Sequence, residues 1–599
     1  MFSSRACYLA LLSLSVSSMS FAQEEALCPL SEDFPADIEL AGLSEVLETN
    51  ARAILISQLQ LVGANLNRAR FEFAVDDGAE LIEQSLQPFG YYSTNISSSW
   101  YCDKTLRLSY QVDVGIPIIV NTHNVQILGP GADNPSLQKW QADFPLANGE
   151  RLIQPDYDRA KRRALTLTSS LGYFDARFQQ AKIAIDRQQA VADIDLELVT
   201  GVRYQLSEVS YQQPHMSNEL IDRYIKFNPG DNYNINDIAQ LQTDLYNSGF
   251  FSVVDIQAEP ERETQSVPVS IRMERAKQNA FNFGIGYSTD TGPRGSFNWT
   301  RRWLNPQGHA AEFDSRLAEN EKFASLTYRI PGADPARENQ YYRVGYVADD
   351  EQENYGSAAQ PAQLILDVDR YFGQIGWVRQ RGNWTFDYYF QAQKESLLVT
   401  EDKNDTLNTA IIFPGVEVRY LESDDLFRPT RGFSFSARTR FASKFLGSDT
   451  DILYFSSNAV FTRQFTPKHQ LTLRGWLGTN LLKDEATLPA NFRFYQGGDT
   501  SVRGYNYREL GPNQNGYLTG GASEIGFTAE YEYFMWPDIA VALFTDAGDA
   551  FFDRDFDLNQ SLGIGFHWYS PVGPIRIDYA RPLDPDESAQ LHIIIRANL

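Results

Sequence analysis

The second half of the chain alternates apolar and polar residues one by one, and this pattern predicts β-strands. In FNFGIGYS, residues 281–288, the odd-numbered positions are apolar and the even-numbered positions carry Asn, Gly and Ser. LHIIIRANL, residues 591–599, shows a similar alternation. Alternation over about ten residues is typical of the strands of a transmembrane barrel, although a soluble sandwich alternates too.

Sixteen segments of this kind lie between Ala280 and Leu599. Short turns containing proline, such as Thr466-Pro467-Lys468, alternate with longer loops, of which 482–518 is the longest. Short periplasmic turns and long external loops are expected of outer-membrane barrels. We therefore predict an all-β, 16-stranded antiparallel transmembrane β-barrel over residues 277–599, with 482–518 as its sixth external loop, between strands eleven and twelve.

The first half of the chain has helical periodicity and repeats itself three times. The copies LQPFGYYSTNI, TSSLGYFDARF and LYNSGFFSVVDI each end a helical pattern with a glycine, at Gly90, Gly172 and Gly249. Glycine at this position adopts the left-handed conformation that ends a helix. Two aromatic residues follow each glycine, and we expect them to enter a strand, where half-buried aromatic residues are common.

Around each of these glycines the order of elements is strand, helix, helix, strand, strand. In the first copy the strands are expected at 37–40, 91–101 and 105–114, and the helices at 44–58 and 68–87. The pattern predicts three tandem α+β units of the order β-α-α-β-β.

These units divide the first half of the chain into residues 23–114, 115–200 and 201–276. A sheet of this kind leaves one edge open, and an open edge can accept a strand from another polypeptide. The alternative is that the repeats are passive spacers.

The first residues, MFSSRACYLALLSLSVSSMSFA (1–22), have a basic start, a short apolar run and small residues at the end. This pattern predicts a secretory signal peptide, and its apolar run is too short to span a membrane. Since an exported chain meets an oxidising compartment, we expect a disulfide between Cys28 and Cys102 that acts as a structural staple. No later apolar run is long enough for a transmembrane helix.

Composition and motifs exclude several function classes. A net charge of −25 argues against binding to nucleic acid, and 13% aromatic residues suit a barrel with aromatic girdles. The sequence contains no GxSxG, HExxH or CxxC motif. DRDFDLNQ (553–560) begins like a calcium loop, but Leu558 and Ile564 stand where glycine and glutamate are needed. We expect neither an enzyme nor a bound metal or cofactor.

The stretch GGDTSVRGYNY, residues 497–507, lies in the predicted sixth loop and carries a single arginine, Arg503. Taken alone it is a surface turn with an incidental charge. Together with the tandem repeats and the barrel, however, the motif Val502-Arg503-Gly504-Tyr505 resembles the outer-membrane assembly and two-partner-secretion superfamily. LFTDAGD (543–549) and GPIRIDYARPL (573–583) support the resemblance, which covers nearly the whole chain after the signal peptide. It implies that the repeats are POTRA domains.

The resemblance implies that loop six folds back into the lumen and that Arg503 contacts acidic groups on strands twelve and thirteen. Alternation places Asp546 and Glu530 on the inward faces of those strands, and we assign them as its partners. The rigid arginine fork can serve two carboxylates, and Gly504 would allow close approach of the backbone. In a wet lumen such pairs would be weak, so we expect them to position the loop.

Strand one contains Gly284 and Gly286, and glycine weakens a strand interior. Strand sixteen would present Ile593 and Ile595 to the same seam. We expect a lateral gate at this seam, with relief of crowding in the lumen as the alternative explanation of the glycines. Leu599 departs from the aromatic residue that commonly ends barrel proteins, which puts recognition of the last strand in question.

Within the superfamily, three repeats and this length are most similar to the TamA family, the outer-membrane subunits of the translocation and assembly module. The resemblance implies an insertase or translocase in the bacterial outer membrane with its repeats in the periplasm. The implied partners are unfolded client polypeptides such as autotransporters, outer-membrane lipid and a TamB-like protein anchored in the inner membrane. The alternatives are a two-partner-secretion pore, a general barrel assembly factor and a structural receptor.

Overall fold

The computed structural model describes residues 36–62, 68–102, 106–213, 215–355, 362–398, 406–425, 428–482, 488–552, 557–571, 573–585 and 587–598. They form two compact units. One unit holds the first two repeats and part of the third, and the other holds the rest of the third repeat and the barrel.

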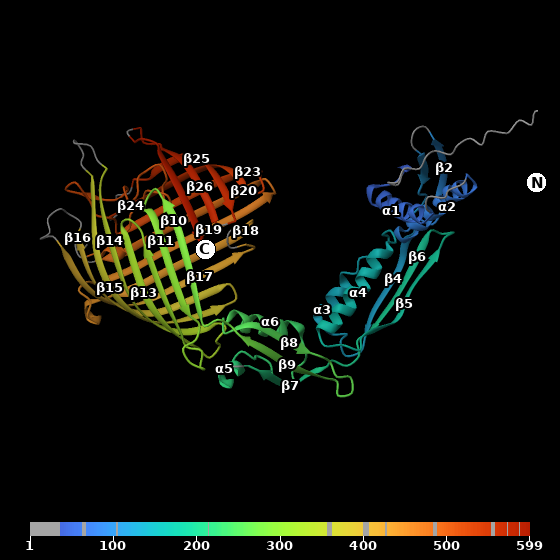
Figure 1. Cartoon of the computed structure of the whole chain (residues 1–599), viewed down its shortest axis with the longest axis horizontal. Helices are drawn as coiled ribbons and strands as arrows, with labels where there is room; N and C mark the ends of the chain where they lie inside the picture. Colours follow the sequence, from blue (N-terminus) through green and yellow to red (C-terminus); the bar gives the residue numbers. More distant parts are fainter. Residues whose placement is uncertain are drawn as a thin grey trace, which may run out of the picture. The chain divides into compact units, whose positions relative to one another are not determined.

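Each repeat has the predicted β-α-α-β-β order (Figure 1). The first comprises β1 (Ala36–Ala41), α1 (Glu45–Val62), α2 (Arg68–Leu86), β2 (Asn95–Cys102) and β3 (Leu106–Asp113). The second comprises β4 (Ile119–Leu128), α3 (Pro135–Ala142), α4 (Gln154–Ser170), β5 (Arg177–Asp186) and β6 (Val191–Val199). The third comprises β7 (Gln205–Gln212), α5 (Asn218–Asp222), α6 (Ile235–Asn247), β8 (Phe251–Ala258) and β9 (Ser266–Arg275).

The last strand of each repeat lies in the middle of its sheet, in the orders β1-β3-β2, β4-β6-β5 and β7-β9-β8. Because this strand has neighbours on both sides, its alternate residues form the core. In β6 these residues are Ala192, Ile194, Leu196 and Leu198, all buried. In Figure 1, α3 and α4 lie on one face of that sheet.

The three helix-ending glycines have the left-handed conformation, with φ of 88° at Gly90, 91° at Gly172 and 73° at Gly249. The expectation that the following aromatics enter a strand was wrong in the first two repeats, whose strands begin later, at Asn95 and Arg177.

The reason is that these segments join one repeat to the next. The amide of Ile118 donates to the Gly90 carbonyl at 2.8 Å, and the amide of Tyr204 donates to the Gly172 carbonyl at 2.9 Å. The ring of Phe174 packs against that of Tyr204, with centroids 5.3 Å apart. The aromatics therefore stabilise the junctions instead of continuing as strands.

The barrel contains sixteen long strands among the described residues, and it closes by pairing of the first with the last. They are β10 (Asn279–Ser288), β11 (Gly292–Arg301), β12 (Ala310–Leu317), β13 (Glu321–Pro331), β14 (Glu338–Asn354), β15 (Gln363–Arg381), β16 (Trp384–Leu398), β17 (Leu407–Ser423), β18 (Arg431–Ala442), β19 (Ile452–Thr466), β20 (His469–Leu482), β23 (Ser523–Trp536), β24 (Ile539–Phe551), β25 (Asn559–Ser570), β26 (Gly573–Pro582) and β27 (Gln590–Asn598). Neighbouring strands are antiparallel, which confirms the predicted fold class.

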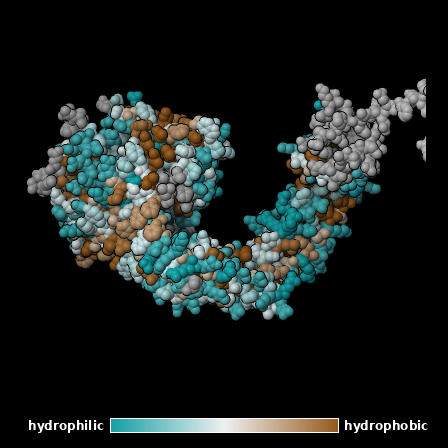
Figure 2. Space-filling model, in the orientation of Figure 1, coloured by the Kyte–Doolittle hydropathy of each residue, from teal (hydrophilic) through white to brown (hydrophobic). Residues whose placement is uncertain are grey.

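The outer face of the barrel is apolar. Phe283 and Ile285 of β10 are 57% and 62% exposed, and Figure 2 shows brown, apolar side chains on this outer surface. A sandwich would bury such residues in its core. The alternation in the sequence is therefore that of a barrel whose apolar side chains point outward.

The third repeat contacts a turn of the barrel. Nη1 of Arg223 donates to the carbonyl of Gly332 at 2.6 Å, and Lys226 pairs with Asp334 at 3.2 Å. Both barrel residues lie in the turn between β13 and β14.

Three predictions fall outside the described residues. The signal peptide, residues 1–22, and Cys28 both lie there, so the disulfide between Cys28 and Cys102 stays a prediction. Leu599 lies there too. Within the described part of the chain, no helix is both long and apolar enough to cross a membrane.

Candidate functional site: loop six inside the barrel

Loop six joins β20 to β23, which pair directly with each other, and it folds into the barrel. Its described part, residues 488–522, includes the short helix η5 (Ala490–Phe492) and the small strands β21 (Asn513–Gln514) and β22 (Tyr517–Leu518). Phe492 is fully buried against Phe413 and Tyr454 of the wall, with ring centroids 5.7 and 5.4 Å away. The loop therefore occupies the lumen with a packed apolar interface.

The three glycines of GGDTSVRGYNY all have positive φ, 102° at Gly497, 100° at Gly498 and 98° at Gly504. A Cβ on Gly504 would lie 3.2 Å from Cδ of Pro582 and 3.3 Å from Cβ of Ser561. Only glycine adopts this positive φ without strain, and only glycine has no Cβ to meet Pro582 and Ser561. Gly504 therefore lets the loop lie directly against β25 and β26.

Val502 and Tyr505, on either side of the Arg503-Gly504 pair, are buried and form an apolar cluster with Leu510 of the same loop. Burying two apolar residues beside Arg503 fixes the path of the backbone from which the arginine projects.

Arg503 binds both of the partners assigned from the sequence. Its Nε and Nη2 donate to the two carboxylate oxygens of Asp546 on β24 at 2.7 and 3.0 Å. Its Nη1 donates to Glu530 on β23 at 2.8 Å. The backbone amide of Arg503 adds a further bond to Asp546, at 3.1 Å.

Arg503 makes two further contacts that were not predicted from the sequence. Nη1 also donates to Asp578 of β26 at 2.9 Å, and the guanidinium carbon lies 3.4 Å from the ring centroid of Phe544. Alternation on β26 would have placed Asp578 inward, since Ile577 and Tyr579 face outward. Its distance from loop six, however, follows only from closure of the barrel.

The expectation of weak, water-screened pairs was wrong. Arg503 is 4% exposed and Asp546 is fully buried. The packed loop excludes water from these groups, so Coulomb attraction acts in a medium of lower dielectric constant. Removing one partner of such a buried pair is strongly destabilising because it leaves charges uncompensated.

The Arg503 site continues into a polar network between strands. Arg576 of β26 donates to the same Glu530 at 2.5 Å. His567 of β25 bonds to Asp578 at 2.9 Å and to Glu532 of β23 at 2.6 Å. Four adjacent strands thus converge on the tip of loop six.

The ion pairs of Arg508, a second arginine of the loop, were not predicted from the sequence either. It pairs with Asp349 and Glu351 of β14, each at 2.9 Å. Arg503 and Arg508 therefore fasten the loop to two separate groups of strands.

In the described part of the chain, two groups of three side chains each bring possible metal-ligand atoms within 4.8 Å of one another. The first group is Asp290, Asp499 and His592, and the second is Glu530, His567 and Asp578. In the second group, Glu530 forms ion pairs with Arg503 and Arg576, so these two arginines already supply positive charge to the group. Protein hydrogen bonds already engage both groups.

The seam between β10 and β27 is short. Among the described residues their register runs from Gly284 opposite Asn598 to Ser288 opposite Ile594, whereas β10 pairs with β11 along its whole length. Fewer paired residues mean fewer hydrogen bonds to break at the seam.

The structure places all four predicted gate residues at or beside this seam. Gly284 and Gly286 lie within it, and Ile595 is opposite Tyr287. Ile593 lies beyond the register, where its carbonyl accepts the amide of Thr289 at 3.1 Å. A Cβ on Gly286 would lie 2.8 Å from the Ile595 carbonyl oxygen, so this glycine permits close approach of the two strands.

The fold and the lumen site define an outer-membrane β-barrel with tandem POTRA repeats and an inward-folded sixth loop. The Omp85 superfamily domain matches residues 265–592, and a POTRA family, described as surface antigen variable number repeat, matches residues 204–274. The chain belongs to the Omp85 superfamily. It is accordingly an outer-membrane protein with its POTRA repeats in the periplasm.

Two relatives share the description outer membrane protein assembly factor BamA. That from Nitratidesulfovibrio vulgaris is 25% identical over 389 residues, covering 62% of this chain and 48% of the relative. That from Neorickettsia risticii is 22% identical over 425 residues, covering 65% of this chain and 54% of the relative. The chain thus spans about half the length of the relatives it matches.

The fold is shared with a solved structure. BamA from Haemophilus ducreyi lacking POTRA domains 1–3 superposes with a TM-score of 0.62 at 14% identity, covering 80% of this chain and all of that one. CdiB from Acinetobacter baumannii has a TM-score of 0.45 at 15% identity, covering 80% of this chain and 90% of that one.

Proposed function

We propose that the protein is an outer-membrane insertase or translocase that assembles exported β-strand polypeptides at a lateral gate between β10 and β27. The observation that carries the proposal is the seam, Gly284–Ser288 against Ile594–Asn598. Its five residue pairs are fewer than the six between β26 and β27 and the seven to seventeen between the other neighbouring long strands, among the described residues. Unpaired backbone groups at a parted seam would template an incoming strand, as at any exposed sheet edge.

The POTRA repeats would collect clients before insertion. Each sheet places its last strand centrally and therefore has two outer strands, such as β4 and β5 in the second repeat. Strand addition at such an edge recognises backbone groups and needs no particular client sequence. Autotransporters and other β-barrel proteins are the clients that suit this chemistry.

The resemblance to the TamA family motivates a more specific proposal. The described part of the chain contains three repeats. The expected partner is a TamB-like protein that spans the periplasm from an inner-membrane anchor, with outer-membrane lipid as a further contact. Co-purification of the full chain with such a partner from membranes tests this assignment. Recovery of the full chain without it after in-cell crosslinking would count against it.

A disulfide across the seam tests the gate. Tyr287 and Ile595 lie opposite each other, so Tyr287→Cys with Ile595→Cys, in a chain with Cys28 and Cys102 replaced by serine, should lock it. Oxidation should abolish client insertion into proteoliposomes, and reductant should restore it. The control is Tyr531→Cys with Leu543→Cys, a pair opposite each other within the wall. Full insertion by the oxidised seam pair would refute the gate.

The rival function is a secretion pore through the lumen. One observation favours it: a polar cavity of about 470 Å³ lies between loop six and the wall, lined by residues that include Glu417, Arg438 and Arg508. Large, fluctuating single-channel conductance in planar bilayers would support the pore, whereas a nearly closed barrel would support the insertase.

A further inference from the structure

We propose that Asp499 of loop six is a latch that holds both edges of the seam, so that the gate opens when its carboxylate releases β27. This inference rests on the proposed lateral gate and identifies the residue that keeps it closed. Asp499 stands four positions before Arg503, in the same glycine-rich stretch.

On one side of the seam, Asp499 binds the end of β10. The hydroxyl of Ser288, the last residue of β10, donates to Oδ2 of Asp499 at 2.5 Å. The hydroxyl of the next residue, Thr289, donates to Oδ1 at 2.8 Å.

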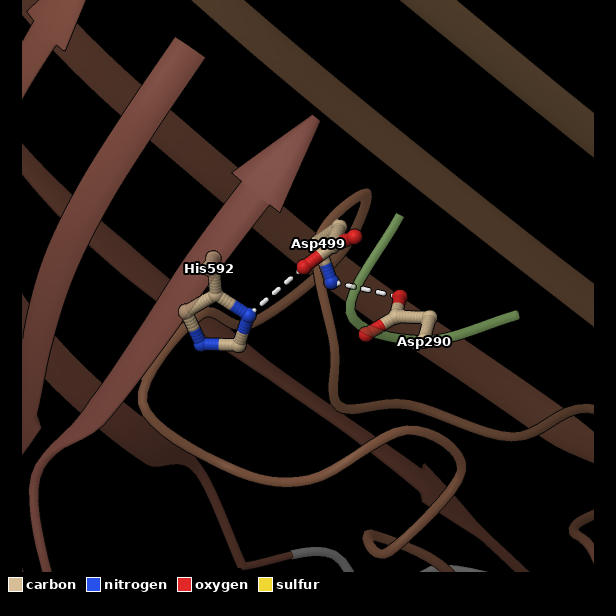
Figure 3. A group of neighbouring side chains, drawn as sticks. All are labelled: Asp290, Asp499 and His592. Atoms are coloured by element: carbon tan, nitrogen blue, oxygen red, sulfur yellow. Dashed lines mark hydrogen bonds and ion pairs between the residues drawn. The ribbon is translucent and has the colours of Figure 1, made fainter. Parts of the chain in front are cut away.

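On the other side, Asp499 binds β27. Nδ1 of His592 lies 2.7 Å from Oδ1 of Asp499 (Figure 3). The amide of Gly504 donates to Nε2 of the same ring at 2.8 Å, so Nε2 is the acceptor and the ring proton is on Nδ1. His592 therefore donates to Asp499, and β27 is tied to loop six at two points.

These contacts are well placed to control the seam. Ser288 ends the register of β10 with β27, and Asp499, Ser288 and His592 are only 5%, 5% and 3% exposed. Hydrogen bonds to a carboxylate are stronger than neutral ones and gain further strength away from water. One side chain thus connects strands that share few backbone bonds.

The neighbours of Asp499 hold it in this position. Its backbone amide donates to Oδ2 of Asp290 at 2.7 Å (Figure 3). A Cβ on Gly498 would lie 2.5 Å from that same oxygen, which explains the second glycine of the stretch. Arg503, fastened to β23, β24 and β26, fixes the other end of the turn.

The arrangement predicts the order of opening. Strand addition at β10 requires β27 to move aside, which breaks both bonds of His592, to the Asp499 carboxylate and from the Gly504 amide. The bonds to Ser288 and Thr289 can persist, so loop six would stay with β10 while β27 leaves.

Hydrogen exchange of the full chain in nanodiscs tests the latch. Asp499→Ala should speed amide exchange about tenfold in peptides covering residues 284–288 and 592–595, with β14–β16 unchanged. The matched control is Glu509→Gln, because that carboxylate accepts bonds from Asn506 of the same loop. In an Asp499→Ala background, Ser288→Ala should add no further increase.

Unchanged exchange at the seam in Asp499→Ala would overturn the latch, as would an equal increase throughout the barrel or an additive effect of Ser288→Ala. If Asp499→Ala does not fold, the pair Ser288→Ala with Thr289→Val replaces it, with about threefold faster exchange expected and no change overturning the latch. A failure of the gate itself would be recognised by a different result: the oxidised variant with Tyr287→Cys and Ile595→Cys would still insert clients.

Discussion

Arg503 of loop six holds Asp546 of β24 through two parallel hydrogen bonds, of 2.7 and 3.0 Å, and both side chains are buried. This bidentate geometry requires a planar guanidinium. It makes Arg503 the fastening point of a loop whose other contacts reach β10, β14 and β27.

Arg503→Ala should leave the barrel folded but release loop six and impair client insertion. The change leaves Glu530, Asp546 and Asp578 with less compensating charge, at a cost of about 3–5 kcal/mol. Protease accessibility of loop six and heat-modifiable migration of the barrel measure the two effects separately. Arg503→Lys should rescue little, since an ammonium cannot replace the fork.

The control for Arg503 is Arg329→Ala, which removes a pair with Glu312 in which the arginine side chain is 46% exposed. Exposed pairs contribute about 0–1 kcal/mol. Equal protease accessibility in the two variants would contradict the fastening role of Arg503.

Gly504→Ala should detach the tip of loop six, because alanine would strain the backbone and its Cβ would collide with neighbouring residues. Its φ of 98° is unfavourable for alanine, and the new Cβ would press on Pro582 and Ser561. Gly149→Ala is the matched control, because its φ is 88° and nothing lies within 4 Å of its Cβ position. The free energy of unfolding should fall by roughly 1–2 kcal/mol for the control, the cost of the left-handed conformation alone, and by more for Gly504→Ala. Similar losses would show that the close approach is unimportant.

Gly286→Ala distinguishes two roles for the seam glycines. If glycine only weakens the strand, alanine should slow hydrogen exchange at the seam. The 2.8 Å approach to the Ile595 carbonyl predicts the opposite, faster exchange in β10 and β27. Gly373→Ala in β15, where nothing lies within 4 Å of the added Cβ, should leave seam exchange unchanged. Slower exchange in Gly286→Ala would favour the first role.

Docking of loop six to the turn after β10 should weaken as the pH rises toward 8. Burial and the nearby Asp499 raise the pKa of Asp290 to about 8, well above its ordinary value of 3.8. A carboxyl with a raised folded-state pKa contributes stability that is full below its unfolded pKa and is lost as pH rises through the folded value. Loop-six protease accessibility should therefore increase between about pH 4 and pH 8 and level off above pH 8.

Asp290→Asn removes this titration and should flatten the pH profile, because its amide oxygen can still accept the Asp499 amide. An Asp290→Asn profile that rises as steeply as that of the unaltered chain would assign the pH dependence to other groups.

Local patterning in the sequence determined the fold class and part of the site. Alternation with a period of two assigns each strand residue to a face whatever its neighbours are. Asp546 and Glu530 could therefore be placed inward without knowing the barrel's radius. The β-α-α-β-β order of the repeats could also be predicted from local sequence, because glycines with positive φ end their helices.

Tertiary structure decided which inward residues meet. Asp578 reaches Arg503, and His592 reaches Asp499, only because closure of the barrel brings β26 and β27 beside a loop that begins after β20. The burial of Arg503 likewise depends on packing of the whole loop, which is why a wet lumen was the wrong expectation from sequence. Alternation gives the direction of a side chain along its own strand, whereas distance and exposure depend on contacts between segments far apart in the chain.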